Sequence, residues 1–237
     1  MDEWIGIATG TCLCVIISVI FVSSLYVWDW IDPQLKRLSR DHPSVIKRRT
    51  ISVVLSSIIG AHLTHIYTGE FEIGRTSIKS LSTTFIQILI LMIGPIVDKS
   101  HEQWRFPSID FAFVRTTMIA PIFEEFVFRQ CFHRILLTSG YTEIAALFVS
   151  PFLFACAHVH HHVHSRDLKY IAAQTIHTCV FGWLGGYLLV YRSLWDAILA
   201  HAVCNYIGLP SYSTTSFPIR VSLYAVGLVT FLGSIIL

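Results

Sequence analysis

The chain has 237 residues, of which 54% are hydrophobic and 14% are charged, and its mean hydropathy is +0.62. This apolar excess is larger than one soluble core of this length needs, so we expect a membrane protein embedded in a lipid bilayer. The formal net charge is only +2 and no basic block carries interleaved aromatic residues, which excludes nucleic-acid binding as the organising function.

Apolar runs of membrane-spanning length occupy most of the chain. A spanning helix needs roughly 17 to 25 mostly apolar residues, and on that measure the sequence predicts an all-α, polytopic membrane protein of about eight transmembrane helices. No repeat or linker divides residues 1–237, so we expect one domain. In chain order the expected spans are 4–28, 51–68, 81–97, 109–137, 143–159, 170–191, 194–209 and 221–237.

The first run, 4–28, carries no charge and follows two acids rather than a basic segment. This pattern favours a retained anchor over a signal peptide. The six cysteines fall within the expected spans without any CxxC pair, so we expect neither disulfides nor a thiolate metal site. They are Cys12, Cys14, Cys131, Cys156, Cys179 and Cys204.

The loop 29–50 holds the dense basic cluster of the sequence. By the positive-inside rule it is cytosolic, and alternation of the spans then places 98–108 and 160–169 on the same side. Determining topology is the favoured role of this cluster, ahead of contact with lipid or substrate. Its basic residues are Lys36, Arg37, Arg40, Lys47, Arg48 and Arg49.

Glu124, Glu125 and Arg129 lie among apolar residues of the fourth run, which reads MIAPIFEEFVFRQCFHRIL. On a helix Glu125 and Arg129 are four residues apart with the acid first, the order that favours an ion pair. Glu124 lies about 100° further around, so we expect it to face a cavity, where it could take a proton from water and return it to a leaving group. The same residues would also suit a structural polar cluster between helices, and this segment alone does not decide between the two.

The seventh run, LWDAILAHAVCNYIGL, pairs a histidine with a carboxamide. His201 and Asn205 are four residues apart on one face, and their N–H donors can meet at one point, as stabilising an oxyanion requires. Asp196 suits the positive end of its helix. Three further histidines are expected to pack or line a cavity: His62, His65 and His177.

Five histidines fall within seven residues of the stretch FACAHVHHHVH. His158 lies at the membrane end of its run, whereas His160, His161, His162 and His164 approach the polar loop. If the helix continues, His158, His161 and His162 share a face that could hold a metal ion. Zinc needs three or four ligands and no HExxH pattern is present, so a solvated helix end is the competing interpretation.

Three of these stretches resemble the motifs of a known family. EEFVFR at 124–129, FACAH at 154–158 and HAVCN at 201–205 match, in order and spacing, E-E-x-x-x-R, F-x-x-x-H and H-x-x-x-N of the CPBP intramembrane proteases. The stretches RDHPSVIKRR at 40–49 and AHVHH look like the eukaryotic type II CaaX prenyl proteases, the Ras-converting enzymes. The resemblance covers about residues 40 to 209.

The resemblance implies a multi-pass protease of the endoplasmic reticulum membrane with a polar catalytic cavity open to the cytosol. Such an enzyme removes the last three residues of farnesylated or geranylgeranylated CaaX proteins, such as Ras-type small GTPases, and uses no cofactor or metal. A prenyl chain favours lipid, at about 0.8 kcal/mol per buried CH2, whereas the bond to be cut must meet water. A wet cavity that opens to both phases meets the two needs.

The resemblance also implies roles for individual residues. Glu124 and His158 would position and deprotonate the attacking water, and His201 and Asn205 would stabilise the oxyanion. Two other interpretations remain open: a zinc protease with Glu124, His158 and His201 as ligands, and a non-catalytic membrane scaffold or transporter. The supporting residues are expected to be Glu125 and Arg129, and the cavity rim His161 and His162.

Overall fold

The computed structural model describes residues 3–70, 72–100, 108–158, 168–208 and 217–236. Within these ranges every regular element is a helix and no strand occurs, which confirms the all-α prediction. The longer elements are α1 (Glu3–Ser24), α3 (Pro43–Thr68), α4 (Ile78–Leu91), α9 (Glu143–His158), α10 (Leu168–Tyr191), α11 (Leu194–Ile207) and α12 (Phe217–Ile236). The shorter ones are α2 (Val27–Ile31), a 3-10 turn (Pro33–Arg37), α5 (Ile93–Ser100), α6 (Phe111–Val114), α7 (Ala120–Glu125) and α8 (Phe132–Thr138).

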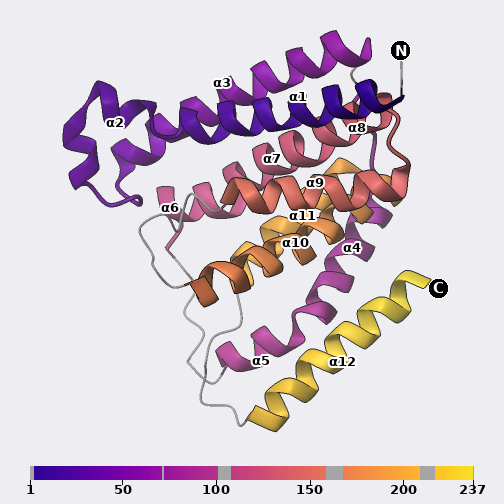
Figure 1. Ribbon diagram of the computed structural model, residues 1–237. Helices are drawn as coiled ribbons and strands as arrows, with labels where there is room; N and C mark the ends of the chain where they lie inside the picture. Colours follow the sequence, from indigo (N-terminus) through magenta and orange to yellow (C-terminus); the bar gives the residue numbers. More distant parts are fainter. Residues whose placement is uncertain (1–2, 71, 101–107, 159–167, 209–216, 237) are drawn as a thin grey trace.

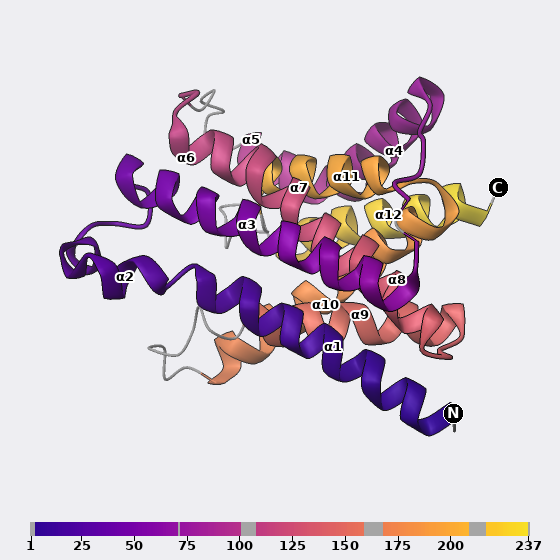
Figure 2. The same cartoon turned by 90° about the horizontal axis from the view of Figure 1, so that it is seen from above.

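The helices form a bundle in which sequence-distant segments are neighbours. Helices α1 and α3 run side by side along one edge, and α12 packs against α4 and α5 at the opposite edge (Figure 1). Between them α10 packs on α9, and α11 lies against both α7 and α4 (Figure 2). Helix α11 is therefore held from two sides.

Within the described part of the chain, two helices are long and apolar enough to cross a membrane, Trp4–Ser24 and Pro43–Thr68. Helices Ile78–Leu91 and Glu143–His158 are apolar but shorter. Large hydrophobic side chains lie on the outside of the bundle, among them Ile78 and Ile144, as lipid contact allows. Membrane character is thus supported, while eight crossings stay a prediction.

Helix α3 begins earlier than the sequence indicated, so the prediction of a loop through residue 50 is wrong. Pro43 occupies the first turn, where its missing N–H costs nothing, and a His42 ring nitrogen accepts a backbone N–H of that turn. The helix therefore takes up the second half of the basic cluster: Lys47, Arg48 and Arg49.

The third expected span is also not one continuous helix. It breaks at Met92, between α4 and α5. Pro95 has no N–H to donate to the Leu91 carbonyl, which weakens the helix at this point. The Leu91 carbonyl oxygen lies beside Gly227 of α12, where an added Cβ would be 2.9 Å away, so α12 approaches closely at the break.

The fourth span is helical from Phe111 to Thr138 but contains two π-helical segments, Arg115–Ile119 and Phe126–Cys131. In the first, the Ala120 N–H bonds the Arg115 carbonyl, five residues back. The two segments flank α7, which carries Glu124 and Glu125. Such wide turns are frequent at functional sites.

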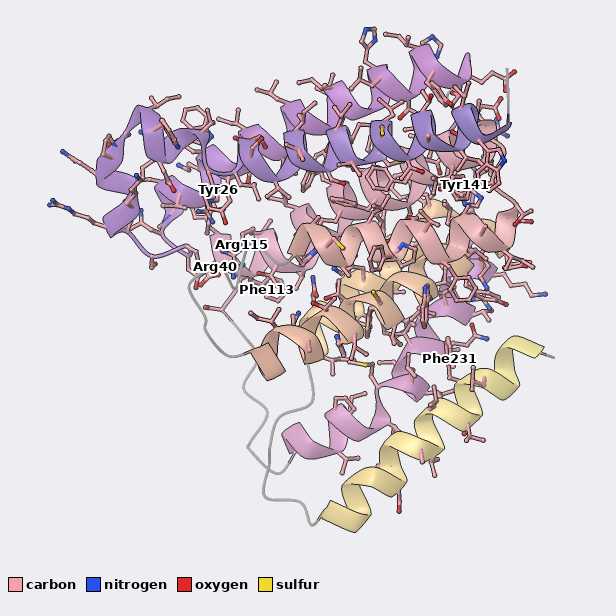
Figure 3. The ribbon with its side chains drawn as sticks, viewed as in Figure 1. Tyr26, Arg40, Phe113, Arg115, Tyr141 and Phe231 are labelled. Atoms are coloured by element: carbon pink, nitrogen blue, oxygen red, sulfur yellow. The ribbon has the colours of Figure 1, made fainter. Side chains whose placement is uncertain are left out.

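The buried side chains form two clusters. One joins α1, the second π segment and α9 through the rings of Phe21, Phe128 and Phe154, with centroid distances of 5.3 and 4.9 Å from Phe128. The other joins α4, α10, α11 and α12. Tyr141 marks one end of the bundle, and Arg40 and Arg115 mark the other (Figure 3).

Candidate active site

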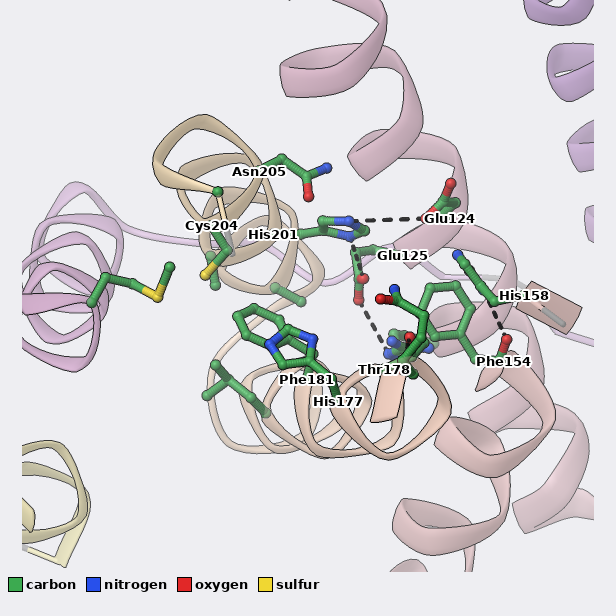
Figure 4. A pocket seen from close by; sticks show the side chains of 18 residues that line it. Glu124, Glu125, Phe154, His158, His177, Thr178, Phe181, His201, Cys204 and Asn205 are labelled. Carbon is green, nitrogen blue, oxygen red and sulfur yellow. Dashed lines mark hydrogen bonds and ion pairs between the residues drawn. The ribbon is translucent and has the colours of Figure 1, made fainter. Parts of the chain in front are cut away.

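A cavity of about 200 Å³ lies between α7, α9, α10 and α11 (Figure 4). It brings together every predicted catalytic and supporting residue, although they span 81 positions of the chain. These are Glu124, Glu125, Arg129, His158, His201 and Asn205. The predicted rim residues His161 and His162, with His160 and His164, lie outside the described residues.

Glu125 is the buried centre of the site. Its Oε2 lies 3.2 Å from Arg129 Nε, which confirms the predicted ion pair, and both side chains are nearly inaccessible. Its Oε1 lies 2.8 Å from His201 Nδ1. Because a carboxylate only accepts, this ring nitrogen carries the hydrogen, so Glu125 fixes the orientation of His201.

Glu124 has a different environment from its neighbour, as the helical spacing predicted. Its side chain is 21% exposed, compared with 3% for Glu125. Its Oε2 lies 3.9 Å from His201 Nε2, which is longer than a direct hydrogen bond. Glu124 is therefore a carboxylate with access to the cavity beside an ordered imidazole.

His158 stands in the last turn of α9, and its Nδ1 lies 2.9 Å from the Phe154 carbonyl oxygen. A carbonyl only accepts, so Nδ1 donates and Nε2 of the neutral ring carries the lone pair. Figure 4 shows this ring directed towards Glu124. The Phe154 and His158 rings form an edge-to-face contact, with centroids 4.3 Å apart. The Arg129 guanidinium lies over the same Phe154 ring.

Asn205 has a structural contact that the sequence analysis did not foresee. Its Nδ2 donates to the Thr116 carbonyl at 2.9 Å. In the π pattern that carbonyl would accept from residue 121, which is Pro121 and has no N–H. Asn205 supplies the missing donor with one of its two N–H groups, and so joins α11 to the helix that carries Glu124.

One face of α10 closes the cavity, and the sequence analysis assigned none of it to the site. His177 was expected only to pack or line a cavity, and its ring stacks on Phe181 with centroids 5.1 Å apart. Spacings of three and four residues place these side chains on one face, so helical periodicity could have found them. They are Gln174, His177, Thr178, Phe181 and Gly185.

Gly185 lets α10 approach the buried ion pair. A Cβ at this position would lie 2.8 Å from Glu125 Oε2 and 3.0 Å from Arg129 Nε. Gly182, one turn earlier, faces Pro151 of α9 in the same way, with 2.6 Å between an added Cβ and the Pro151 Cβ. The two glycines therefore determine how tightly α10 covers the site.

Asp196 is more than the helix-terminal charge that the sequence suggested. It is fully buried, and four hydroxyl groups contact its carboxylate. The donors at 2.6 to 3.0 Å are the hydroxyls of Thr76, Ser80, Thr84 and Ser193. Asp196 thus attaches the start of α11 to α4.

Among the residues that the structure describes, no three His, Cys, Asp or Glu side chains group as a metal site. The zinc set of Glu124, His158 and His201 is therefore not assembled in this arrangement. Both ring nitrogens of His201 face carboxylates instead.

Comparison with known proteins agrees with this geometry. Residues 107–207 match the family model described as "Type II CAAX prenyl endopeptidase Rce1-like". The "Probable CAAX prenyl protease 2" of Schizosaccharomyces pombe is 33% identical over 215 residues, which cover 82% of this chain and 79% of the relative. The chain belongs to the type II CAAX prenyl endopeptidase family.

Other members of this family are similar over most of their length. The human "CAAX prenyl protease 2" is 28% identical, covering 87% of this chain and 74% of the relative. The rat protein of the same name is 27% identical, and the match covers 84% of this chain and 68% of the relative. No solved structure matches the chain. In this Rce1-like chain, the region matched by the family model contains all six predicted catalytic and supporting residues.

Proposed function

We propose that this chain is an intramembrane endopeptidase that removes the C-terminal tripeptide of prenylated CaaX proteins by activating water with Glu124. Family membership supports the reaction class, because the relatives are named CAAX prenyl proteases. The observation that carries the mechanism is the pair of adjacent acids with separate tasks. Glu125 holds His201 at 2.8 Å, and Glu124 reaches the cavity.

In the proposed reaction, water lies between Glu124 and His158. Glu124 takes a proton from this water, whose oxygen attacks the carbonyl carbon of the scissile peptide bond. The Nε2 lone pair of His158 accepts a hydrogen bond from the same water and orients it. When the C–N bond breaks, Glu124 returns the proton to the nitrogen of the departing tripeptide.

The oxyanion of the tetrahedral intermediate is assigned to His201 and Asn205. An imidazolium carries N–H groups on both nitrogens, and the two nitrogens of His201 face the carboxylates of Glu125 and Glu124. Its Nδ1–H stays on Glu125, and its Nε2–H is directed into the cavity. The second N–H of Asn205 completes the pair of donors, while Glu125 and Arg129 support the arrangement.

The membrane arrangement is part of the same proposal. We assign the chain, as one domain, to eight spans of the endoplasmic reticulum membrane with the active site accessible from the cytosol. The high mean hydropathy, the two helices of spanning length and the basic residues near the start of α3 support it. The proposed substrates are farnesylated or geranylgeranylated CaaX proteins, such as Ras-type small GTPases.

Mass spectrometry of a farnesylated CaaX peptide incubated with the purified full chain tests this function. We expect loss of the mass of the last three residues, with and without a chelator. No cleavage in either condition would contradict the protease assignment and favour a scaffold or transporter. Cleavage only without chelator would favour the zinc enzyme.

A further inference from the structure

A second cavity, of about 120 Å³, lies on the other side of Glu124 from His201. Three arginines line it: Arg40, Arg49 and Arg115. They come from the segment before α3, from α3 itself and from the first π segment. Glu124 lines both this cavity and the one that contains His201, so one carboxylate stands at the junction of the two.

The arginines are partly fixed by their neighbours. Arg115 Nη1 donates to Asp41 Oδ1 at 2.7 Å and to the Arg40 carbonyl at 3.2 Å. Figure 3 shows Arg40 and Arg115 together at one end of the bundle, near Tyr26. The Arg49 guanidinium lies 5.7 Å from the centre of the Tyr26 ring. These contacts hold two of the three cations at the cavity before any ligand arrives.

The charge around this cavity is unbalanced. Among the residues that the structure describes, three arginines and one acid, Glu124, line it, and Asp41 pairs with Arg115. An anionic ligand would restore the balance. A guanidinium presents parallel N–H donors that match the two oxygens of a carboxylate. The remaining wall is largely apolar and includes Phe21, Ile46 and Val53.

We propose that Arg40, Arg49 and Arg115 bind the terminal α-carboxylate of the substrate and thereby position the bond three residues from the end beside Glu124. This inference rests on the proposed function. Three extended residues span at most about 10 to 11 Å, so a terminus held in one cavity fixes which bond reaches the neighbouring one. The apolar wall suits the aliphatic residues of a CaaX sequence.

The size of the cavity agrees with this ligand. A volume of about 120 Å³ holds several water molecules. It therefore admits the carboxylate end of a peptide. An anionic lipid phosphate offers similar chemistry, but the shared wall with Glu124 favours the substrate terminus over a lipid headgroup.

Two farnesylated peptides of identical sequence test the proposal, one ending in a free carboxylate and one in an amide. Both are assayed with the full chain in vesicles of neutral phosphatidylcholine. We expect kcat/KM to be about 10- to 100-fold higher for the carboxylate, as a hydrogen-bonded charged group implies. The difference should appear mainly in KM, because the arginines act in binding.

Arg49→Gln and Arg115→Gln should each reduce the preference for the carboxylate peptide. Two variants are used because Arg115 also pairs with Asp41, so its loss can disturb the fold. Arg48→Gln is the matched control. It removes the neighbouring arginine of α3, which pairs with Asp32 at 2.9 Å and does not line the cavity, and it should keep the wild-type preference.

The outcomes separate this inference from the proposed function. Equal cleavage of both peptides by the wild type would overturn the carboxylate site and leave the protease intact. A preference for the carboxylate peptide that survives in both arginine variants would also overturn the carboxylate site. The site would be overturned too if these arginines were needed only for activation of the enzyme by added phosphatidylserine. Cleavage of neither peptide would contradict the protease assignment itself.

Discussion

The two halves of α11, the first end with Asp196 and the second with His201, are attached to the bundle by different chemistry. At its start, Asp196 accepts from hydroxyl groups alone, at 2.6 to 3.0 Å. Five residues later, His201 contacts Glu125 and approaches Glu124, at 2.8 and 3.9 Å. Both ends bury a carboxylate, but hydroxyls do not titrate near neutral pH, whereas acids and imidazoles exchange protons.

The contrast shows which end is available for chemistry. The Asp196 carboxylate has four donors around it, so little capacity for a ligand is left. Near His201, three buried atoms lack an aligned hydrogen-bond partner among the described residues: Glu125 Oε2, Arg129 Nε and Arg129 Nη1. The Arg129 and Glu125 atoms that face each other at 3.2 Å form an ion pair without that alignment. We infer that the first end serves stability and the second serves the reaction.

The largest effect is expected at the His201 end, from Glu124→Gln. The amide keeps the size of the side chain but no longer accepts a proton, so kcat should fall about 10²- to 10⁴-fold, the usual contribution of a general base. Peptide cleavage by the purified variant measures it, with thermal unfolding as the check on folding. Glu143→Gln, at an exposed acid at the start of α9, is the control. Wild-type activity in Glu124→Gln would remove Glu124 from the mechanism.

Asn205→Ala distinguishes a catalytic from a structural amide. If Asn205 donates to the oxyanion, kcat should fall by the equivalent of about 2.7 to 4 kcal/mol. If it only satisfies the Thr116 carbonyl, the variant should lose about 1 to 3 kcal/mol of unfolding free energy and keep kcat. Steady-state kinetics and thermal unfolding of the same preparation give both values.

Asp196→Asn should have the smallest effect on catalysis. Its amide group cannot accept from four hydroxyls, so we expect a loss of about 1 to 3 kcal/mol in unfolding free energy, with kcat of the folded protein unchanged. Thr84→Val, which removes one of the four donors, should cost about 1 kcal/mol. A fall in kcat without a fall in stability would contradict the division between the two ends.

Local patterns predicted much of this molecule. Apolar runs predicted where helices occur, and the i, i+4 rule predicted the contact of Glu125 with Arg129 at 3.2 Å. The spacing also separated the buried Glu125 from the accessible Glu124. These features depend on residues within one helical turn of each other, which sequence periodicity describes directly.

Sequence periodicity did not predict contacts between distant segments. Glu125 and His201 are 76 positions apart, and nothing in their local spacing indicates that they touch. The early start of α3 and the break at Met92 depend on single prolines, Pro43 and Pro95, within runs that hydropathy treats as uniform. Arg115 was not singled out at all, because a lone arginine before an apolar run carries no pattern.

Because of the π segment Arg115–Ile119, the number of residues between Arg115 and Glu124 determines how these two side chains are oriented relative to each other. A π turn holds about one residue more than an α turn, and each residue advances a helix by about 100°. The π turn takes up this extra residue, so the residues before and after it keep the register of an α-helix that is one residue shorter. An uninterrupted α-helix of the same length would instead turn Arg115 by about 100° relative to Glu124, and so separate two residues that line the second cavity.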